Sequence, residues 1–125
     1  FFERILVILQ GNTSKPGPAF HERYSKLLLQ LTYESVAAGD VSTMLYEPVL
    51  NSLALLLTPV GPDYQYSRKN AIEIILMLMK DDQNKKPLAA NERLLTELVN
   101  FCSNMTSGEQ KEQVKQVILK LIPEL

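Results

Sequence analysis

Apolar residues recur along this chain at spacings of three and four, the period of an amphipathic α-helix, and segments rich in proline, glycine and polar residues interrupt them. No stretch alternates apolar and polar residues over a useful length, so a β-sheet is not expected. The pattern therefore predicts an all-α fold of about six helices. They are expected at residues 1–10, 19–38, 41–58 and 67–80, between Asn91 and Cys102, and from Ser107 to Pro123.

Several helix boundaries have specific signals in the sequence. Gly39 follows the second predicted helix and is placed to end it in a left-handed conformation. Pro48 lies inside the third predicted helix and cannot donate a backbone hydrogen bond, so a kink or a restart is expected there. Asn91 is a suitable N-cap, and Ser107 with Gln110 three residues later forms a capping box.

The helix predicted at residues 67–80 is apolar on nearly all sides, which is typical of a helix packed between others. We therefore expect it to be the central element of the fold. The segment 81–87 carries charges of both signs and is predicted to be a solvated loop. The helix after it is expected to bury a face made of Leu94, Leu95, Leu98, Val99 and Cys102.

Short connections make consecutive helices antiparallel, which leaves two architectures, a closed helical bundle and an open solenoid of helix pairs. A basic residue precedes an apolar run in three of the helices, at Arg23, Arg68 and Lys115. These positions are 45 and 47 residues apart, close to the roughly 40–47 residues of HEAT and armadillo units. The spacing favours a short solenoid, with a closed bundle as the alternative.

Residues 45–80 contain Pro48 early in a first helix, Asp63 in the following turn and Arg68 at the start of a second helix. This arrangement resembles units of the HEAT/armadillo family, which commonly place a proline, an aspartate and a basic residue at these points. The resemblance implies that residues 1–125 are a single helical-repeat segment of a larger protein. It also implies a scaffold that binds protein partners and contacts neighbouring repeats of its parent chain.

Composition narrows the classes of partner. The chain of 125 residues has 13 basic and 14 acidic side chains, so it lacks the broad positive field of a nucleic-acid-binding protein. No apolar run approaches the roughly 20 residues of a membrane-spanning helix, and no membrane association is expected. The single cysteine fits a reducing compartment, the cytoplasm or the nucleus. Two glycosylation sequons, at Asn12 and Asn104, are the only features that favour secretion.

Catalytic residues, cofactors and metal sites are not expected, because the chain has one histidine and one cysteine. His21 and Glu22 are adjacent on a predicted helix and point in different directions, so they are interpreted as a surface pair. Cys102 lies at an apolar helical position and is interpreted as a small core residue. An enzymatic function is therefore not predicted.

The predicted function is a non-catalytic protein–protein interaction scaffold within a larger regulatory protein. Tyr64, Tyr66, Arg68 and Lys69 lie at the entry to the helix at 67–80 and are predicted to bind the partner, because aromatic and arginine side chains dominate many interfaces. An ordinary solvated turn is the alternative interpretation of these four residues. The alternative function is a self-contained helical bundle acting as a regulatory or signalling module.

Overall fold

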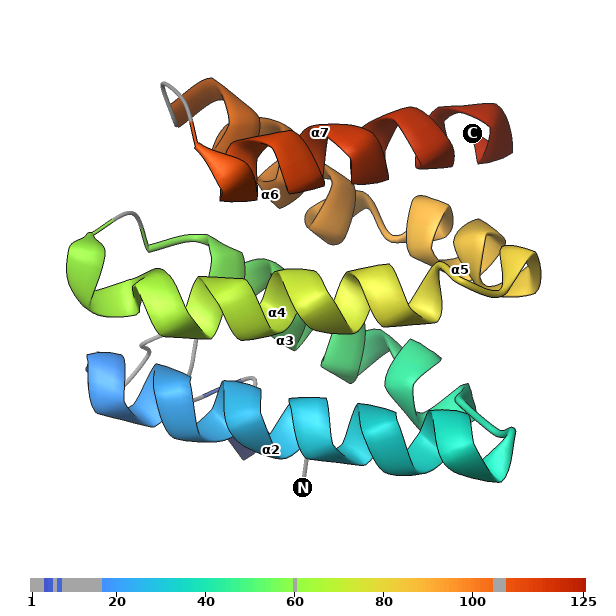
Figure 1. Ribbon diagram of the computed structural model, residues 1–125, viewed down its shortest axis with the longest axis horizontal. Coiled ribbons are helices and arrows are strands. Elements are labelled where there is room, and N and C mark those ends of the chain that lie inside the picture. The colour runs from blue at the N-terminus through green and yellow to red at the C-terminus, as the bar shows by residue number, and fades with distance from the viewer. Residues whose placement is uncertain (1–3, 6, 8–16, 60, 105–107) are drawn as a thin grey trace.

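The computed structural model describes residues 4–5, 7, 17–59, 61–104 and 108–125, and over this part of the chain it is helical with no strand (Figure 1). The all-α prediction is confirmed for these residues. Of the first predicted helix, 1–10, only Arg4, Ile5 and Val7 are described, and Ile5 packs against the core. The α-helices are α2 (Pro18–Ala38), α3 (Glu47–Leu57), α4 (Gln65–Leu78), α5 (Lys85–Ala90), α6 (Glu92–Asn104) and α7 (Glu109–Leu121). The 3₁₀ turns are η1 (Ser42–Leu45), η2 (Pro62–Tyr64), η3 (Asp82–Asn84) and η4 (Ile122–Glu124).

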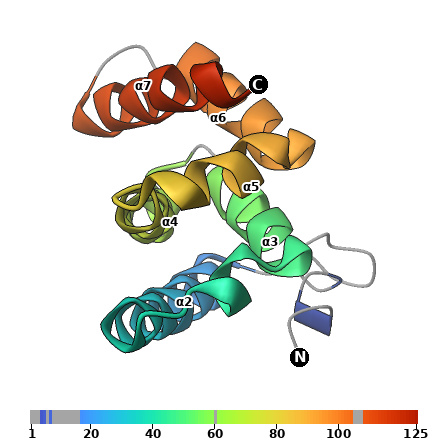
Figure 2. The same ribbon diagram turned by 90° about the vertical axis from the view of Figure 1, so that its right-hand side faces the viewer.

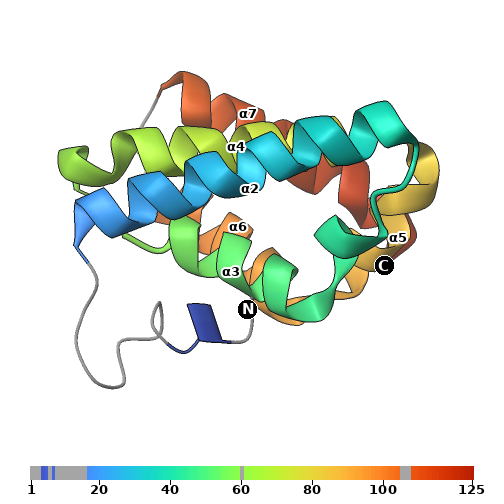
Figure 3. The same cartoon turned by 90° about the horizontal axis from the view of Figure 1, so that it is seen from below.

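The helices lie in two layers. Figure 1 shows α2, α4 and α7 side by side and running in the same direction, with α4 between the other two. Helices α3 and α6 lie behind them and run the opposite way, and the views from the side and from below separate the layers (Figures 2 and 3). Within the layers α4 contacts both α2 and α7, and α3 contacts α6.

Two boundary predictions are confirmed. Helix α2 ends at Gly39, which has φ 76° and ψ 17°, and its N–H donates back to the last turn of the helix. The predicted interruption near Pro48 is a restart, because Tyr46 is extended (φ −61°, ψ 134°) between η1 and α3. Pro48 then lies in the first turn of α3, where its missing N–H costs no helical hydrogen bond.

The predicted loop at 81–87 is wrong, because this segment holds η3 and the start of α5. Pro87 does not prevent the helix, since the first turn needs no N–H from it. Asn84 is buried, and its Nδ2 donates to the carbonyl oxygen of Leu78 at 2.9 Å. Asn84 thus supplies a hydrogen-bond donor to the last residue of α4, and α5 begins directly after Asn84.

Helix α4 is the central element, as predicted. Ile72, Ile74, Ile75 and Leu78 are all buried, and the helix contacts α2, α3 and α7. An apolar surface on nearly every side is what this position between three helices requires.

Helix α6 follows the prediction in part. Asn91 caps it, because its Oδ1 accepts from the backbone N–H of Leu94 at 2.9 Å. The buried face consists of Leu94, Leu98 and Phe101, whereas Val99 is 51% exposed, so the prediction for Val99 is wrong. Val99 is rotated by about 100° from Leu98 and misses the interface with α3.

The capping box predicted for the last helix falls on Ser107, which lies outside the described residues. The other member of the box, Gln110, directs its Nε2 to the carbonyl oxygen of Gln65 at 3.3 Å. Helix α7 begins after Gly108, whose φ of 125° favours glycine.

The three basic residues that suggested a repeat have different environments, because Arg68 is buried while Arg23 and Lys115 are exposed. A repeat is instead visible in the buried positions, which recur after 43 residues. From α2 to α4, the corresponding buried residues are Tyr24 and Ser67, Leu28 and Ala71, Thr32 and Ile75. From α4 to α7, they are Ala71 and Val114, Ile74 and Val117, Leu78 and Leu121.

Candidate binding surface between α4 and α7

A groove of about 810 Å³ runs between α4 and α7 on the layer that faces the viewer in Figure 1. Helical spacing places its α4 side chains in one row, because residues three or four apart share a face. We call this site the α4–α7 groove. It is lined by Pro62, Gln65, Arg68, Lys69, Glu73 and Leu76 on one side and by Gly108, Glu109, Gln110 and Gln113 on the other.

Hydrogen bonds from neighbouring helices fix both walls of the groove. Gln110 Nε2 donates to the carbonyl oxygen of Gln65 and joins the start of α7 to the start of α4. Tyr33 of α2 donates its hydroxyl to Glu73 Oε1 at 2.8 Å, and this bond raises the pKa of Tyr33. The carboxylate of Glu73 is therefore held in place from the side opposite α7.

The chemical character of the groove is polar and nearly balanced in charge. Lys69 is exposed on one wall, Glu109 is exposed on the other, and Glu73 lies half-buried further along α4. Gln65, Gln110 and Gln113 bring side-chain amides, each of which offers both donors and acceptors. Such a surface can hydrogen-bond a ligand that itself alternates donors and acceptors.

The four predicted partner-binding residues do not share one surface. Lys69 lines the α4–α7 groove and is exposed, and Tyr66 is 62% exposed but is not part of the groove lining. Tyr64 is half-buried, and its ring lies edge-on to the ring of His21 with the centroids 5.0 Å apart. Partner binding by Tyr64, Tyr66, Arg68 and Lys69 stays a prediction.

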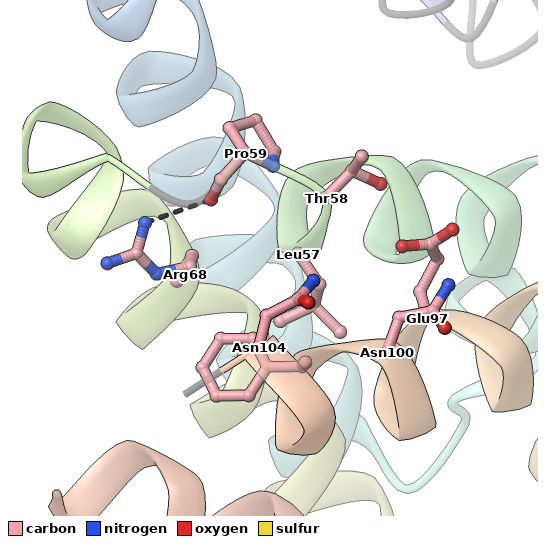
Figure 4. A pocket seen from close by; sticks show the side chains of 8 residues that line it. Leu57, Thr58, Pro59, Arg68, Glu97, Asn100 and Asn104 are labelled. Carbon is pink, nitrogen blue, oxygen red and sulfur yellow. Dashed lines mark hydrogen bonds between the residues drawn. The ribbon is translucent and has the colours of Figure 1, made fainter. Parts of the chain in front are cut away.

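Arg68 has a structural role that the sequence did not reveal. Its side chain is only 5% exposed, and Nη1 donates to the carbonyl oxygen of Pro59 at 2.9 Å, as Figure 4 shows, and to that of Gly61 at 2.8 Å. Burial lowers the pKa of its guanidinium below the usual value. Arg68 thus fixes the turn between α3 and α4, and part of it also lines the α4–α7 groove.

Behind Arg68 lies a small cavity of about 10 Å³, shown in Figure 4. Its walls come from the end of α3, from Arg68 and from one side of α6: Leu57, Thr58, Pro59, Arg68, Glu97, Asn100, Phe101 and Asn104. A volume of this size accommodates about one water molecule. The cavity is too small for a substrate, so the α4–α7 groove is the better candidate site.

His21 is not the surface residue that the sequence suggested. It is 4% exposed and packs beneath Tyr64, while Glu22 remains partly exposed and pairs with Lys26 at 3.3 Å. The Nδ1 atom is buried without a hydrogen-bond partner among the described residues. Burial lowers the pKa of the imidazole below 6.5, so His21 is held in its neutral form.

A pH dependence of stability follows from His21. Because its pKa is lower in the folded chain than in the unfolded chain, the unfolded state binds more protons just below pH 6.5. The contribution of His21 to the free energy of unfolding is therefore expected to be fully present above pH 6.5. Below that pH the free energy of unfolding should fall as the pH drops, by at most about 1.4 kcal/mol per pH unit. Urea unfolding of the native chain and of His21→Gln between pH 7 and 5 measures this slope. An equal slope in both proteins would exclude His21 as its source.

Cys102 is partly buried and packs against the core, and burial raises the pKa of its thiol.

Among the described residues no group of three or more His, Cys, Asp or Glu side chains is arranged to hold a metal ion. Within the same residues no helix combines the length and the apolar character needed to cross a membrane. Comparisons of the chain with protein-family models, with curated proteins and with solved structures find no match.

Proposed function

We propose that the chain is a non-catalytic protein-interaction segment of a larger regulatory protein, built as a short HEAT/armadillo-like stack of helix pairs. Two observations support the stack. Helices α2, α4 and α7 run in the same direction with α4 in the middle, and buried positions recur after 43 residues, within the range of such repeats. The alternative, a closed bundle, would bring α2 and α7 together.

Hydrogen bonds between the parallel helices also support a repeating arrangement. Asn70 Nδ2 of α4 donates to Ser25 Oγ of α2 at 3.0 Å, and Gln110 of α7 bonds to Gln65 of α4. Each bond joins residues 45 positions apart in the sequence. Successive helices of the layer therefore meet in a similar register, as stacked repeats do.

We infer that the partner binds in the α4–α7 groove as an extended polypeptide segment. The observation that carries this inference is the lining of the groove, which combines three glutamine amides with charges of both signs. A polypeptide backbone presents one donor and one acceptor per residue, which matches such amides. A volume of about 810 Å³ is also in the range of sites that enclose several side chains.

Site-specific photo-crosslinking tests the proposed groove. A photoreactive amino acid replaces Gln65 inside the groove, or Thr96 on the exposed side of α6 as the matched control. We expect a polypeptide to crosslink from position 65 but not from position 96. This product should be lost in Lys69→Glu, which reverses the charge at position 69 and makes the groove negative. Circular dichroism checks that Lys69→Glu remains folded. Identical products from both positions, or none from position 65, would contradict binding in the groove.

A further inference from the structure

A second surface lies on the outer side of the α6–α7 pair, at the top of Figure 1. Val99 of α6, Leu119 of α7 and Ile122, which directly follows α7 at the start of η4, are each about half exposed, at 51%, 52% and 52%. Leu95 and Cys102, four and three residues from Val99, and Ile118, four residues from Ile122, are half-buried. We call this surface the α6–α7 end face, and it consists of Leu95, Val99, Cys102, Ile118, Leu119 and Ile122.

Two lysines border the α6–α7 end face. The Sγ atom of Cys102 lies 4.0 Å from the carbonyl oxygen of Lys111, which places the start of α7 beside this part of α6. Burial raises the pKa of Cys102, the charges of Lys111 and Lys115 oppose this rise, and the charge of Glu112 adds to it. Ion pairs within 4.0 Å in the described part of the chain involve Lys26 and Lys85 instead. The apolar strip therefore has a border of two lysines and one glutamate, Glu112, which is basic by one charge.

The repeat within the fold indicates what covers such a face. After a shift of 43 residues, Leu119 and Ile122 of α7 correspond to Leu76 and Met79 of α4. Met79 is buried, and Leu76 is partly buried in the groove beside α7. On α4, therefore, the equivalent face is covered by the following helix pair.

The covering helix also has a recognisable chemistry. Helix α7 presents an apolar stripe to α4 and carries Glu109 and Glu112 in its first turn. Glu109 faces the wall of the α4–α7 groove that holds Arg68 and Lys69. Lys111 occupies the position on α7 that Arg68 occupies on α4, so the same complementarity of charge is available one repeat later.

We propose that the α6–α7 end face binds an amphipathic helix whose apolar stripe is flanked by carboxylates. Burial of the three half-exposed apolar side chains would supply the affinity, and Lys111 and Lys115 would select acidic helices over basic ones. This surface is separate from the α4–α7 groove, and its occupant does not depend on what the groove binds.

The single cysteine of the chain reports directly on this face, because a bound helix would cover Cys102. The probe is a synthetic peptide with the sequence of residues 108–124, which contains α7 and no cysteine. The intact chain is mixed with the peptide, and the rate at which a thiol reagent modifies Cys102 is measured. A peptide concentration about tenfold above its Kd is expected to slow modification about tenfold, because about a tenth of the chain remains free.

Matched variants make the result specific. The peptide with Glu109→Lys and Glu112→Lys should protect Cys102 far less, and Leu119→Glu with Ile122→Glu in the chain should abolish protection. Leu27→Glu, on the exposed part of α2, is the control that should leave protection unchanged. Three results would overturn the proposal: no protection up to about 1 mM by the peptide that keeps Glu109 and Glu112, equal protection by both peptides, or protection that rises with chain concentration alone, which would assign the face to a second copy.

Discussion

Replacing Arg68 with alanine is expected to lower the free energy of unfolding by about 2–4 kcal/mol, which is unusual for a residue of a type that normally lies on the surface. The guanidinium is buried and donates to two backbone carbonyl oxygens of the α3–α4 turn, at Pro59 and Gly61. Alanine leaves the carbonyl oxygen of Pro59 without its donor, reduces that of Gly61 to the bond from the N–H of Tyr64, and removes the packing of the long side chain. Lysine keeps the charge but not the planar group, so Arg68→Lys should recover only part of the loss.

Urea unfolding followed by circular dichroism measures this effect, with Arg23→Ala as the matched control. Arg23 occupies an exposed position on α2, and its replacement is expected to change stability by less than about 0.5 kcal/mol. If both alanine variants were equally stable, Arg68 would not hold the turn. The partner contact predicted from the sequence would then be the remaining interpretation of Arg68.

Replacing Ile74 with alanine is expected to cost about 2–5 kcal/mol, because it leaves a cavity in the most central helix. Ile74 is fully buried in α4, which is enclosed by α2, α3 and α7. Close packing from three sides limits the collapse of neighbouring side chains into the space. The loss should therefore lie well above the value for an exposed leucine.

Leu119→Ala supplies the comparison, since Leu119 is about half exposed on α7 and its truncation should cost less than about 1 kcal/mol. Thermal and urea unfolding of both variants give the two values. Similar losses for Ile74 and Leu119 would mean that α4 is not more enclosed than α7, against the arrangement described here.

Features set by neighbouring residues in the sequence could be predicted. Gly39 ends α2 and Pro48 restarts α3 because both act on the local backbone, whatever packs around them. The central place of α4 was also predictable, since an apolar surface on nearly every side leaves a helix no solvated face. These are properties of single segments.

Features that depend on two segments could not be predicted in the same way. Residues 81–87 look like a loop because they are polar, and the bond by which Asn84 satisfies the end of α4 is visible only after folding. Arg68 was expected to contact a partner at the surface, but its hydrogen bonds to two carbonyl oxygens of the preceding turn make its burial favourable. The α4–α7 groove combines Gln65 with Gln110, which are far apart in the sequence. Its one local signal is the row of polar residues on the otherwise apolar α4.

The proposed stack is tested most directly by distances between spin labels on α2, α4 and α7. Lys26→Cys, Lys69→Cys and Glu112→Cys, made in pairs on a Cys102→Ser background, place labels at exposed positions that are 43 residues apart. Packed helices lie about 8–10 Å apart, so a stack with α4 in the middle predicts that the 26–112 distance is roughly twice each of the others. Three similar distances would place α2 against α7 and would contradict the stack in favour of a closed bundle.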